Sequence, residues 1–184
     1  GGTQITFSTA PASGASIFIV EISGAVGGPL QSDLNGAELI LDADADTSIT
    51  ADTDDQIDFK TGNSDRFVLS SANAKFNVGA YNAEATLTDA STISWDVSTS
   101  PVAKVTLGAN RTLGAGTNAQ AGQFVSLLII QDGTGSRTVT FNAAYEFKDD
   151  TAPTLTTTAS KGDLFVFRYN GSKFLEVGRN QNLT

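Results

Sequence analysis

Three aspartates at alternate positions, Asp42, Asp44 and Asp46, are the residues whose spacing comes closest to a metal site. Oxygen ligands at positions 1, 3 and 5 begin a calcium-binding EF-hand loop. The match ends there, because Thr47 stands where that loop needs glycine and Thr53 stands where it needs a bidentate glutamate. On a strand, the three carboxylates would lie about 6.6–6.8 Å apart along one face, too far for one ion unless a turn intervenes. We therefore expect a solvated acidic face and keep these aspartates as the metal candidates.

Paired carboxylates suggest a second kind of chemistry, the hydrolysis of glycosidic bonds. That reaction needs two acids about 5–9.5 Å apart across a bound sugar. Adjacent residues on a strand point to opposite faces, so Asp54 and Asp55 do not form such a pair there. Glu146 is a further acid that could take part. Asp149 and Asp150 stand close before Pro153, where we expect an exposed turn. We expect no catalytic residues and no enzymatic activity.

The composition excludes several classes of function. The 184 residues contain no histidine and no cysteine, which removes imidazole catalysis, thiol chemistry, disulfides and Cys/His zinc sites. We expect no cofactor. The net charge of −9, from 20 acidic and 11 basic residues, argues against nucleic acid and against anionic membrane surfaces. No run of 18 apolar residues is present, so we expect no membrane insertion. The lack of cysteine fits synthesis in a reducing cytoplasm.

Aromatic side chains are the candidates for binding a receptor, since exposed rings stack on sugars and Tyr and Trp are enriched at binding hot spots. Tyr145, Phe147 and Tyr169 are the residues that we assign to receptor binding. Trp95 lies between Ser94 and Asp96 in an alternating segment, and we expect it in the core.

The element that must position the acidic residues is the stretch 38–61, which alternates with a period of two. Its even positions are mainly acidic or polar, whereas its odd positions are apolar or small. Fixing the backbone costs about 1–2 kcal/mol per residue, and the few large apolar groups return only about 1.5–3 kcal/mol each. Either turns fold the stretch into short rungs, or other copies of the chain complete its core. The apolar row comprises Leu39, Leu41, Ala43, Ala45, Ile49, Ala51, Ile57 and Phe59.

Three segments follow from the pattern along the chain. Residues 1–29 are expected to contain a β-hairpin, with its turn near residues 10–14, and a glycine-rich linker. We expect this hairpin to close a domain that begins before Gly1, or to act as a pairing arm. A chain starting Gly-Gly is not a native translation start, so we expect it to be processed or to be part of a longer polypeptide. Residues 30–83 form the acidic β-region, and residues 84–184 form a second β-module.

The second module shows short β-rich runs separated by turn signals. Such runs occupy residues 92–97, 103–107, 123–131 and 137–141, and Asn170-Gly171 separates the last two at 164–169 and 173–177. Asn-Gly between alternating runs is a strong hairpin signal. The pattern predicts an all-β fold, with a β-sandwich of jelly-roll-like topology in residues 84–184 and no helix.

Several of these segments also resemble a known class. The runs QDGTGSRTVTF (131–141), TAPTLTTTAS (151–160) and FVFRYNGSKFLEVGR (165–179) resemble a C-terminal β-module of bacteriophage virion proteins, particularly tail fibres and related surface fibres. The segment LILDADADTSITADTDDQIDF (39–59) resembles one found upstream of that module. The opening TQITFSTAPASGASIFIV (3–20) is similar to a hairpin of tail-fibre and appendage modules.

The resemblance implies a non-enzymatic structural protein on the virion surface. It implies a homotrimer with an intertwined β-stalk near residues 38–80, whose core is the apolar row above, and a C-terminal knob at 84–184. Its partners would be other virion proteins and a host surface glycan or protein. A tail fibre that attaches to the host is the first interpretation. The alternatives are a capsid head fibre or decoration protein, a polysaccharide depolymerase tailspike and, more distantly, a secreted adhesin.

Overall fold

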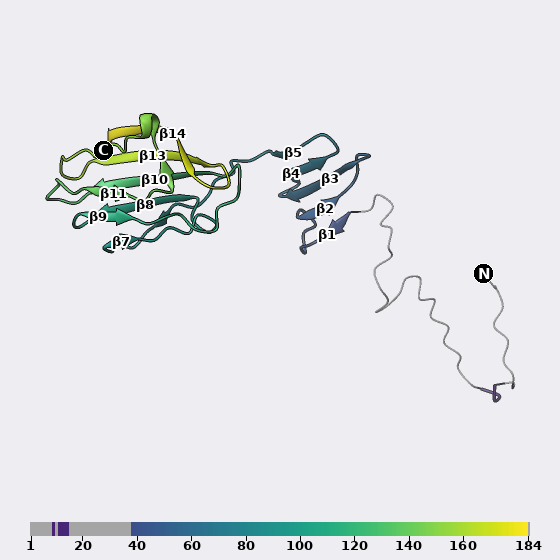
Figure 1. Ribbon diagram of the computed structural model, residues 1–184. Helices are drawn as coiled ribbons and strands as arrows, with labels where there is room; N and C mark the ends of the chain where they lie inside the picture. The colour runs from purple at the N-terminus through teal and green to yellow at the C-terminus, as the bar shows by residue number, and fades with distance from the viewer. Residues whose placement is uncertain (1–8, 10, 15–37, 184) are drawn as a thin grey trace. The chain divides into compact units, whose positions relative to one another are not determined.

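The computed structural model describes residue 9, residues 11–14 and residues 38–183, and these are almost entirely β-structure (Figure 1). Contacts divide the chain into an N-terminal unit, Gly1–Gly79, and a C-terminal unit, Ala80–Thr184. The predicted hairpin in residues 1–29 lies outside the described residues, except for a turn at Ser13 and Gly14. Over the described residues there is no α-helix, and so none that could cross a bilayer. The all-β prediction is confirmed.

The described part of the N-terminal unit is a five-stranded antiparallel sheet in the order β1-β2-β3-β4-β5. Connections at residues 41–47 and 51–55 interrupt the long alternating stretch, with left-handed φ angles of 62° at Ala45 and 59° at Asp55. A single chain therefore folds this stretch into short strands joined by turns, which is the first of the two alternatives. The strands are β1 (Leu39–Ile40), β2 (Ser48–Thr50), β3 (Gln56–Thr61), β4 (Ser64–Ser70) and β5 (Ala74–Phe76).

A two-residue turn sets the register of the central β3–β4 hairpin. Gly62 and Asn63 both have positive φ, 57° and 54°, which is the conformation of a type I′ turn. With that turn and a bulge between Phe59 and Lys60, Phe59 lies opposite Phe67 and Ile57 lies opposite Leu69. Directly opposed residues share a face, so the hairpin gathers its large apolar side chains on one side of the sheet.

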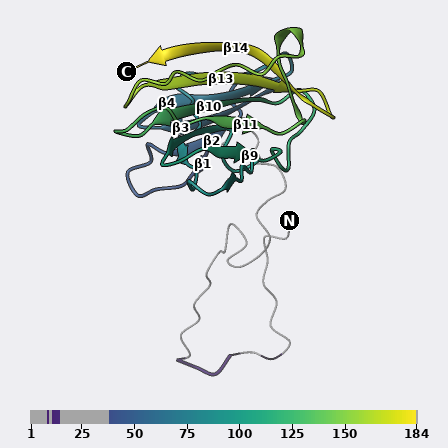
Figure 2. The ribbon, with the colours of Figure 1, turned by 60° about the vertical axis from the view of Figure 1, so that its left-hand side comes forward.

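The C-terminal unit has a six-stranded sheet in the order β12-β14-β13-β10-β8-β6 and a three-stranded sheet in the order β11-β9-β7 (Figure 1 and Figure 2). One short 3₁₀ turn, η1, interrupts the strands. The elements are β6 (Ala85–Thr86), β7 (Thr92–Ile93), β8 (Val102–Leu107), β9 (Arg111–Leu113), β10 (Phe124–Gln131), β11 (Val139–Phe141), β12 (Tyr145–Glu146), η1 (Lys148–Asp150), β13 (Gly162–Tyr169) and β14 (Phe174–Leu183).

From β6 to β11 the chain changes sheet at every strand, so it winds as a coil. Strands β6, β8 and β10 enter the larger sheet, while β7, β9 and β11 enter the smaller one. Neighbours in each sheet are one full turn of the coil apart, and they therefore run parallel, as β8–β10 and β7–β9 do. The chain then closes with the antiparallel β13–β14 hairpin. The jelly-roll-like connectivity expected from the sequence is not confirmed, because jelly rolls are antiparallel.

One apolar core lies between these two sheets. Every second residue of β8, β10 and β13 is buried, which is the pattern of strands with one face on a core. The smaller sheet contributes Ile93 and Leu113, both fully buried. Trp95 belongs to this core, as expected, and its indole Nε1 donates to the Ser100 carbonyl at 2.7 Å. The buried aromatic rings of β13 and β14 complete the core: Phe165, Phe167 and Phe174.

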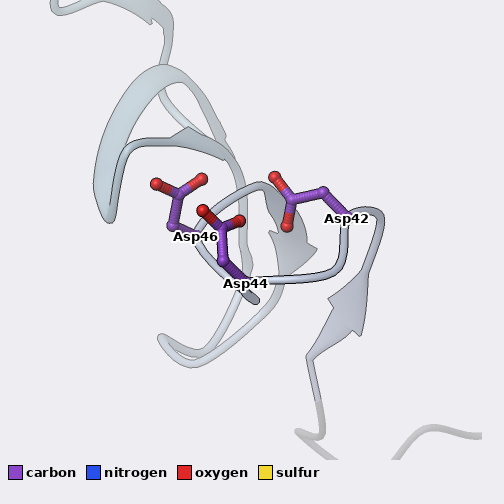
Figure 3. Close-up of side chains that lie close together, drawn as sticks. All are labelled: Asp42, Asp44 and Asp46. Carbon is purple, nitrogen blue, oxygen red and sulfur yellow. The ribbon is translucent and has the colours of Figure 1, made fainter.

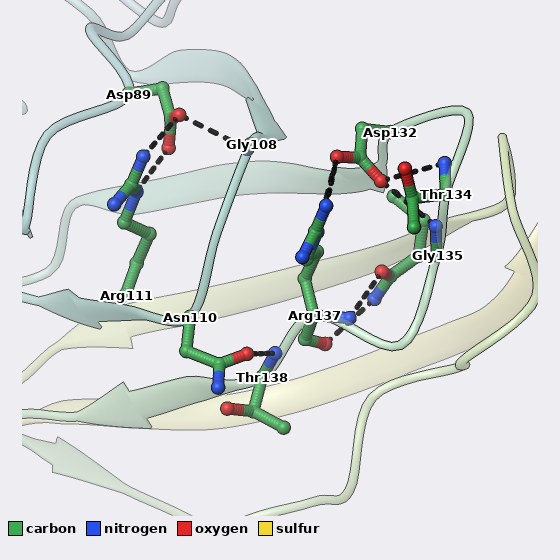
Figure 4. Close-up of polar contacts among 10 residues, drawn as sticks. Asp89, Gly108, Asn110, Arg111, Asp132, Thr134, Gly135, Arg137 and Thr138 are labelled. Atoms are coloured by element: carbon green, nitrogen blue, oxygen red, sulfur yellow. Dashed lines mark hydrogen bonds and ion pairs between the residues drawn. The ribbon is translucent and has the colours of Figure 1, made fainter.

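Polar side chains join successive turns of the coil at its corners (Figure 4). Asp89, before β7, accepts bonds from Arg111 at 2.6 and 2.7 Å and from the Gly108 amide at 3.0 Å. One turn later, the side chain of Asn110 accepts the Thr138 amide at 3.0 Å. In both cases a side chain in one connection accepts a backbone amide of the connection one turn later. These hydrogen bonds hold the loops in place without a helix.

Candidate functional site

The three alternate aspartates lie on the loop between β1 and β2, not on a strand (Figure 3). Asp42, Asp44 and Asp46 offer carboxylate oxygens that all lie within 4.8 Å of one another. The expected strand spacing was wrong here, because the loop reverses the chain. Thr47 holds the loop in shape: its amide donates to Asp42 and its hydroxyl to Asp46, each at 3.2 Å. The hydrogen bonds from Thr47 lower the pKa of Asp42.

The arrangement has the dimensions for a hard cation, because Ca²⁺ binds oxygens at about 2.3–2.6 Å. Asp42 and Asp44 are nevertheless exposed, and Asp46 is only half-buried. The bonds from Thr47 already account for the loop geometry. A solvated acidic face therefore remains the interpretation of this cluster.

The N-terminal sheet leaves its apolar face open. The paired residues Ile57 and Leu69 are 43% and 44% exposed, and Phe76 on the edge strand is 59% exposed. Three rings form a row across this face, with centroids 5.4 Å apart for Phe59 and Phe67 and 4.8 Å apart for Phe67 and Phe76. We call this surface the open apolar face; its residues are Leu39, Ile49, Ile57, Phe59, Phe67, Leu69 and Phe76.

The opposite, polar face of the same sheet is the covered one. Asp58 is only 1% exposed and receives two hydrogen bonds of 2.9 Å from the side-chain amide of Gln56. Lys60 lies over this face with ion pairs to Asp52 at 3.1 Å and Glu38 at 3.8 Å. The expectation that the carboxylates line the outside was therefore wrong for Asp58. Neighbouring polar groups satisfy it, which removes the cost of burial.

The structure brings together only part of the predicted trimer-core row. Its large residues Leu39, Ile49, Ile57 and Phe59 do share the open apolar face. The remaining members lie in the two connections and are exposed: Leu41, Ala43, Ala45 and Ala51. A row of eight along one strand was wrong, because the turns take these four off the sheet.

Sequence reasoning missed the second half of the open apolar face. Phe67 and Leu69 on β4 and Phe76 on β5 lie on the same face as the predicted residues. The signal was present, since Phe67 and Leu69 keep the same period of two in the segment RFVLSS. Only the two-residue turn at Gly62 and Asn63 puts that segment beside β3.

Asp54 and Asp55 both line a hollow of the N-terminal unit, whereas Asp150 lines a hollow of the C-terminal unit with Glu146 and without Asp149. Asp149 and Asp150 are exposed on η1, and both have left-handed backbones with φ of 56° and 52°. Asp54 and Asp55 lie exposed in the connection before β3. The sequence predicted an exposed turn before Pro153, and η1 is that turn.

Two of the three receptor-binding aromatics are buried. Tyr145 and Phe147 are 6% and 7% exposed and pack in the core, so the expectation of free rings there was wrong. The Tyr145 hydroxyl donates to the Gly114 carbonyl at 3.1 Å, and burial raises the pKa of this phenol. Tyr169 is half-buried, with its ring 4.8 Å from that of Phe174. The period of two and the position in the chain did not show which aromatic rings lie in the core and which lie at its rim.

The coil of the C-terminal unit is the part of the chain with a known counterpart. Residues 86–173, from the end of β6 to the hairpin after β13, match the family described as "putative phage tail fibre C-terminal domain". The match supports a phage tail-fibre family. The resemblance recognised in the sequence is confirmed, and the chain is a structural component associated with a bacteriophage virion. No curated protein matches the sequence.

Within the tail-fibre domain, the strongest polar cluster is the loop between β10 and β11 (Figure 4). Asp132 accepts the amides of Thr134 and Gly135 at 2.9 and 2.8 Å and the guanidinium of Arg137 at 2.8 Å. These bonds lower the pKa of Asp132 to about 2, with Arg137 the largest cause. Asp132 therefore holds this loop in shape through bonds to its backbone and to Arg137.

Proposed function

We propose that this protein is a trimeric tail fibre whose C-terminal module attaches the phage to its host. The match of residues 86–173 to tail-fibre C-terminal domains is the observation that carries this proposal. The corners of the coil lend it support, because satisfied loops on a rigid β-scaffold can present a fixed surface to a cell. We propose that the module is not an enzyme.

The proposed homotrimer rests on the open apolar face of the N-terminal unit. Seven apolar residues on one side of a small sheet leave much of the available hydrophobic free energy unused in a single chain, at about 25 cal/mol per Å² of apolar surface. Two further copies supply the same surface and remove it from water around a three-fold axis. We propose this for residues 38–79, with the C-terminal module and other virion proteins at its two ends.

Adsorption is the direct test of the attachment role. The full chain, fluorescently labelled, is incubated with a panel of bacterial strains and, separately, with phage capsids. We expect saturable binding to particular strains, and competition with infection of those strains by the phage. Binding to capsids and not to cells would instead support the head-fibre alternative. Release of shortened saccharides would support the depolymerase.

The mass of the full chain in solution tests the trimer. Light scattering after size-exclusion chromatography should give three times the mass of one chain at micromolar concentration. A well-folded monomer that persists at that concentration would contradict the trimer and leave the attachment role standing.

A further inference from the structure

Two hollows lie side by side on the tail-fibre domain. The first, of about 240 Å³, is bounded by the end of β11, by β12, by η1 and by Lys173 on the last hairpin. The second, of about 410 Å³, lies between residues 137–141 and residues 152–157. Phe141 and Ala152 line both hollows, so the two adjoin along these residues. We call the pair the Phe141 groove.

The first hollow offers charged acceptors and donors close together. Glu146 and Asp150 bring carboxylates to it, and Lys173 brings an ammonium group 3.8 Å from Glu146. Lys173 also donates to the Ala143 carbonyl, which fixes the position of its side chain. Sugar hydroxyls both donate and accept, and neighbouring hydroxyls of one ring can bond to a carboxylate and an ammonium at the same time.

The second hollow offers hydroxyls beside apolar surface. Val139, Pro153 and Leu155 supply the apolar part. Threonine hydroxyls also donate and accept, so they complement a ligand that is itself rich in hydroxyls. The threonines that line this hollow are Thr138, Thr140, Thr154 and Thr157.

The shared wall of the groove is held rigid. The ring of Phe141 packs edge-on against Phe147 at 4.8 Å and Phe165 at 5.5 Å between centroids, and lies 6.1 Å from Tyr145. These contacts fix the ring from the core side. A fixed aromatic wall between polar groups orders a ligand at little conformational cost.

The volume of the two hollows and the groups that line them indicate the class of ligand. Each hollow is at or below the small end of the about 300–1,000 Å³ typical of drug-sized ligands, so each admits about one sugar ring. Two adjoining hollows favour a polymer with repeating units over a single small molecule. Glu146 and Asp150 are balanced by Lys173 and Arg137, which also line the groove, so the groove has no excess of positive charge that would select a phosphate-rich polymer. We infer that the Phe141 groove binds an extended, hydroxyl-rich polysaccharide chain of the cell surface. The inference rests on the proposed attachment function and names its ligand class.

A blocking substitution tests the groove as a whole. Ala152 is exposed and lines both hollows, so Ala152→Trp should fill them from one position. The matched control is Ala90→Trp, at an exposed alanine of the same unit outside both hollows. Binding of the full chain to arrayed bacterial O-polysaccharides, and to maltotriose, cellotriose and triacetylchitotriose, is measured for each. We expect at least a tenfold loss for Ala152→Trp and none for Ala90→Trp.

A pair of isosteric variants tests the chemistry without filling space. Asp150 lines the first hollow, whereas its neighbour Asp149 does not. Both have left-handed backbones, which asparagine tolerates well, so both variants should fold. Asp150→Asn should weaken saccharide binding roughly five- to tenfold, because hydrogen bonds to a charged acceptor are the stronger ones. Asp149→Asn should leave it unchanged.

Three results would overturn the inference. In the first, no arrayed polysaccharide or trisaccharide binds the wild-type chain. In the second, Ala152→Trp binds saccharide as tightly as the wild type does. In the third, adsorption to cells survives periodate oxidation of their glycans and is lost after protease treatment, which would indicate a protein receptor. That third result leaves the attachment role intact, whereas absence of adsorption to any strain contradicts the attachment role itself.

Discussion

The strands of both units alternate with a period of two, but the two units bury opposite faces of them. In the C-terminal unit, alternate residues of β8, β10 and β13 point into a core that the second sheet closes. In the N-terminal unit, the apolar side of the sheet stays open, and the polar side buries Ser48, Thr50 and Asp58. The difference teaches that alternation specifies a strand with two unlike faces, but not which face ends up covered.

A second layer explains the difference. The coil from β6 to β11 supplies two sheets at once, so each apolar face finds a partner within the chain. The N-terminal unit has only one described sheet, and on its polar side Lys60 pairs with Asp52 of the connection at 51–55. We propose that other copies of the chain complete its apolar face, because a small single sheet is marginal alone.

The largest expected effect is a truncation inside the closed core. Phe167 is fully buried, and Phe167→Ala should lower the free energy of unfolding of the C-terminal unit by about 3–5 kcal/mol. Urea titration followed by Trp95 fluorescence reports on this unit alone, because Trp95 is the chain's one tryptophan. The loss should be the same at every protein concentration. A concentration-dependent loss would show that this core, too, is shared between copies.

The matching truncation on the open apolar face should behave differently. Phe76→Ala should cost little in dilute protein, where Phe76 is 59% exposed. Its cost should rise to about 1.5–3 kcal/mol at concentrations where the oligomer is populated, since the side chain is then buried. Thermal melting over a hundredfold range of concentration measures this. A cost independent of concentration would remove the distinction between the two units.

Asp58 in the N-terminal unit and Asp163 in the C-terminal unit are buried carboxylates, and they form a second comparison. Asp163 accepts the Thr156 amide at 2.6 Å on one oxygen and the Asn182 amide at 3.0 Å on the other. In Asp163→Asn one of these donors must face an NH₂ group, which should destabilise the unit by about 1–3 kcal/mol. Among the described residues, the side chain of Asp58 bonds to Gln56 alone, whose amide can turn to offer its oxygen. Asp58→Asn should therefore cost less, and equal losses in urea titration would contradict this.

Acid should act on the C-terminal unit through Asp132. The pKa of Asp132 falls from its ordinary value of 3.8 to about 2 in the folded protein. A lowered folded pKa stabilises the protein above the unfolded value, so this contribution is complete above about pH 4 and is lost as the pH falls toward 2. Asp132→Asn should flatten the dependence of stability on pH in that window. Urea midpoints measured every half pH unit test this, and an unchanged slope would contradict it.

The smallest expected effect concerns the crowded carboxylates of Asp42, Asp44 and Asp46. Asp44→Asn should raise the melting temperature of the N-terminal unit slightly at low salt, because it relieves repulsion. The gain should vanish near 1 M salt, where the screening length is about 3 Å. Asp54→Asn, at an exposed acid outside the cluster, is the control. Stabilisation of the wild type by millimolar Ca²⁺ that Asp44→Asn abolishes would contradict the solvated acidic face.

The sequence by itself determined the features that depend on neighbouring residues. Alternation over a few positions predicted strands in the C-terminal unit, and Asn170-Gly171 predicted the last hairpin, where Asn170 Oδ1 accepts the amides of Ser172 and Lys173. Segments of recognisable sequence also identified the tail-fibre family, and Trp95 was correctly assigned to the core.

Only the tertiary structure decided what depends on which strands meet. The parallel coil of two sheets was not readable, because alternation looks the same in parallel and antiparallel strands. The convergence of Asp42, Asp44 and Asp46 required a loop where the pattern predicted a strand. The open apolar face required the turn at Gly62 and Asn63, and the Phe141 groove joins residues 137 to 173 of the sequence. The physical reason is common to all: register and turn geometry set which side chains are neighbours, and a local pattern does not contain them.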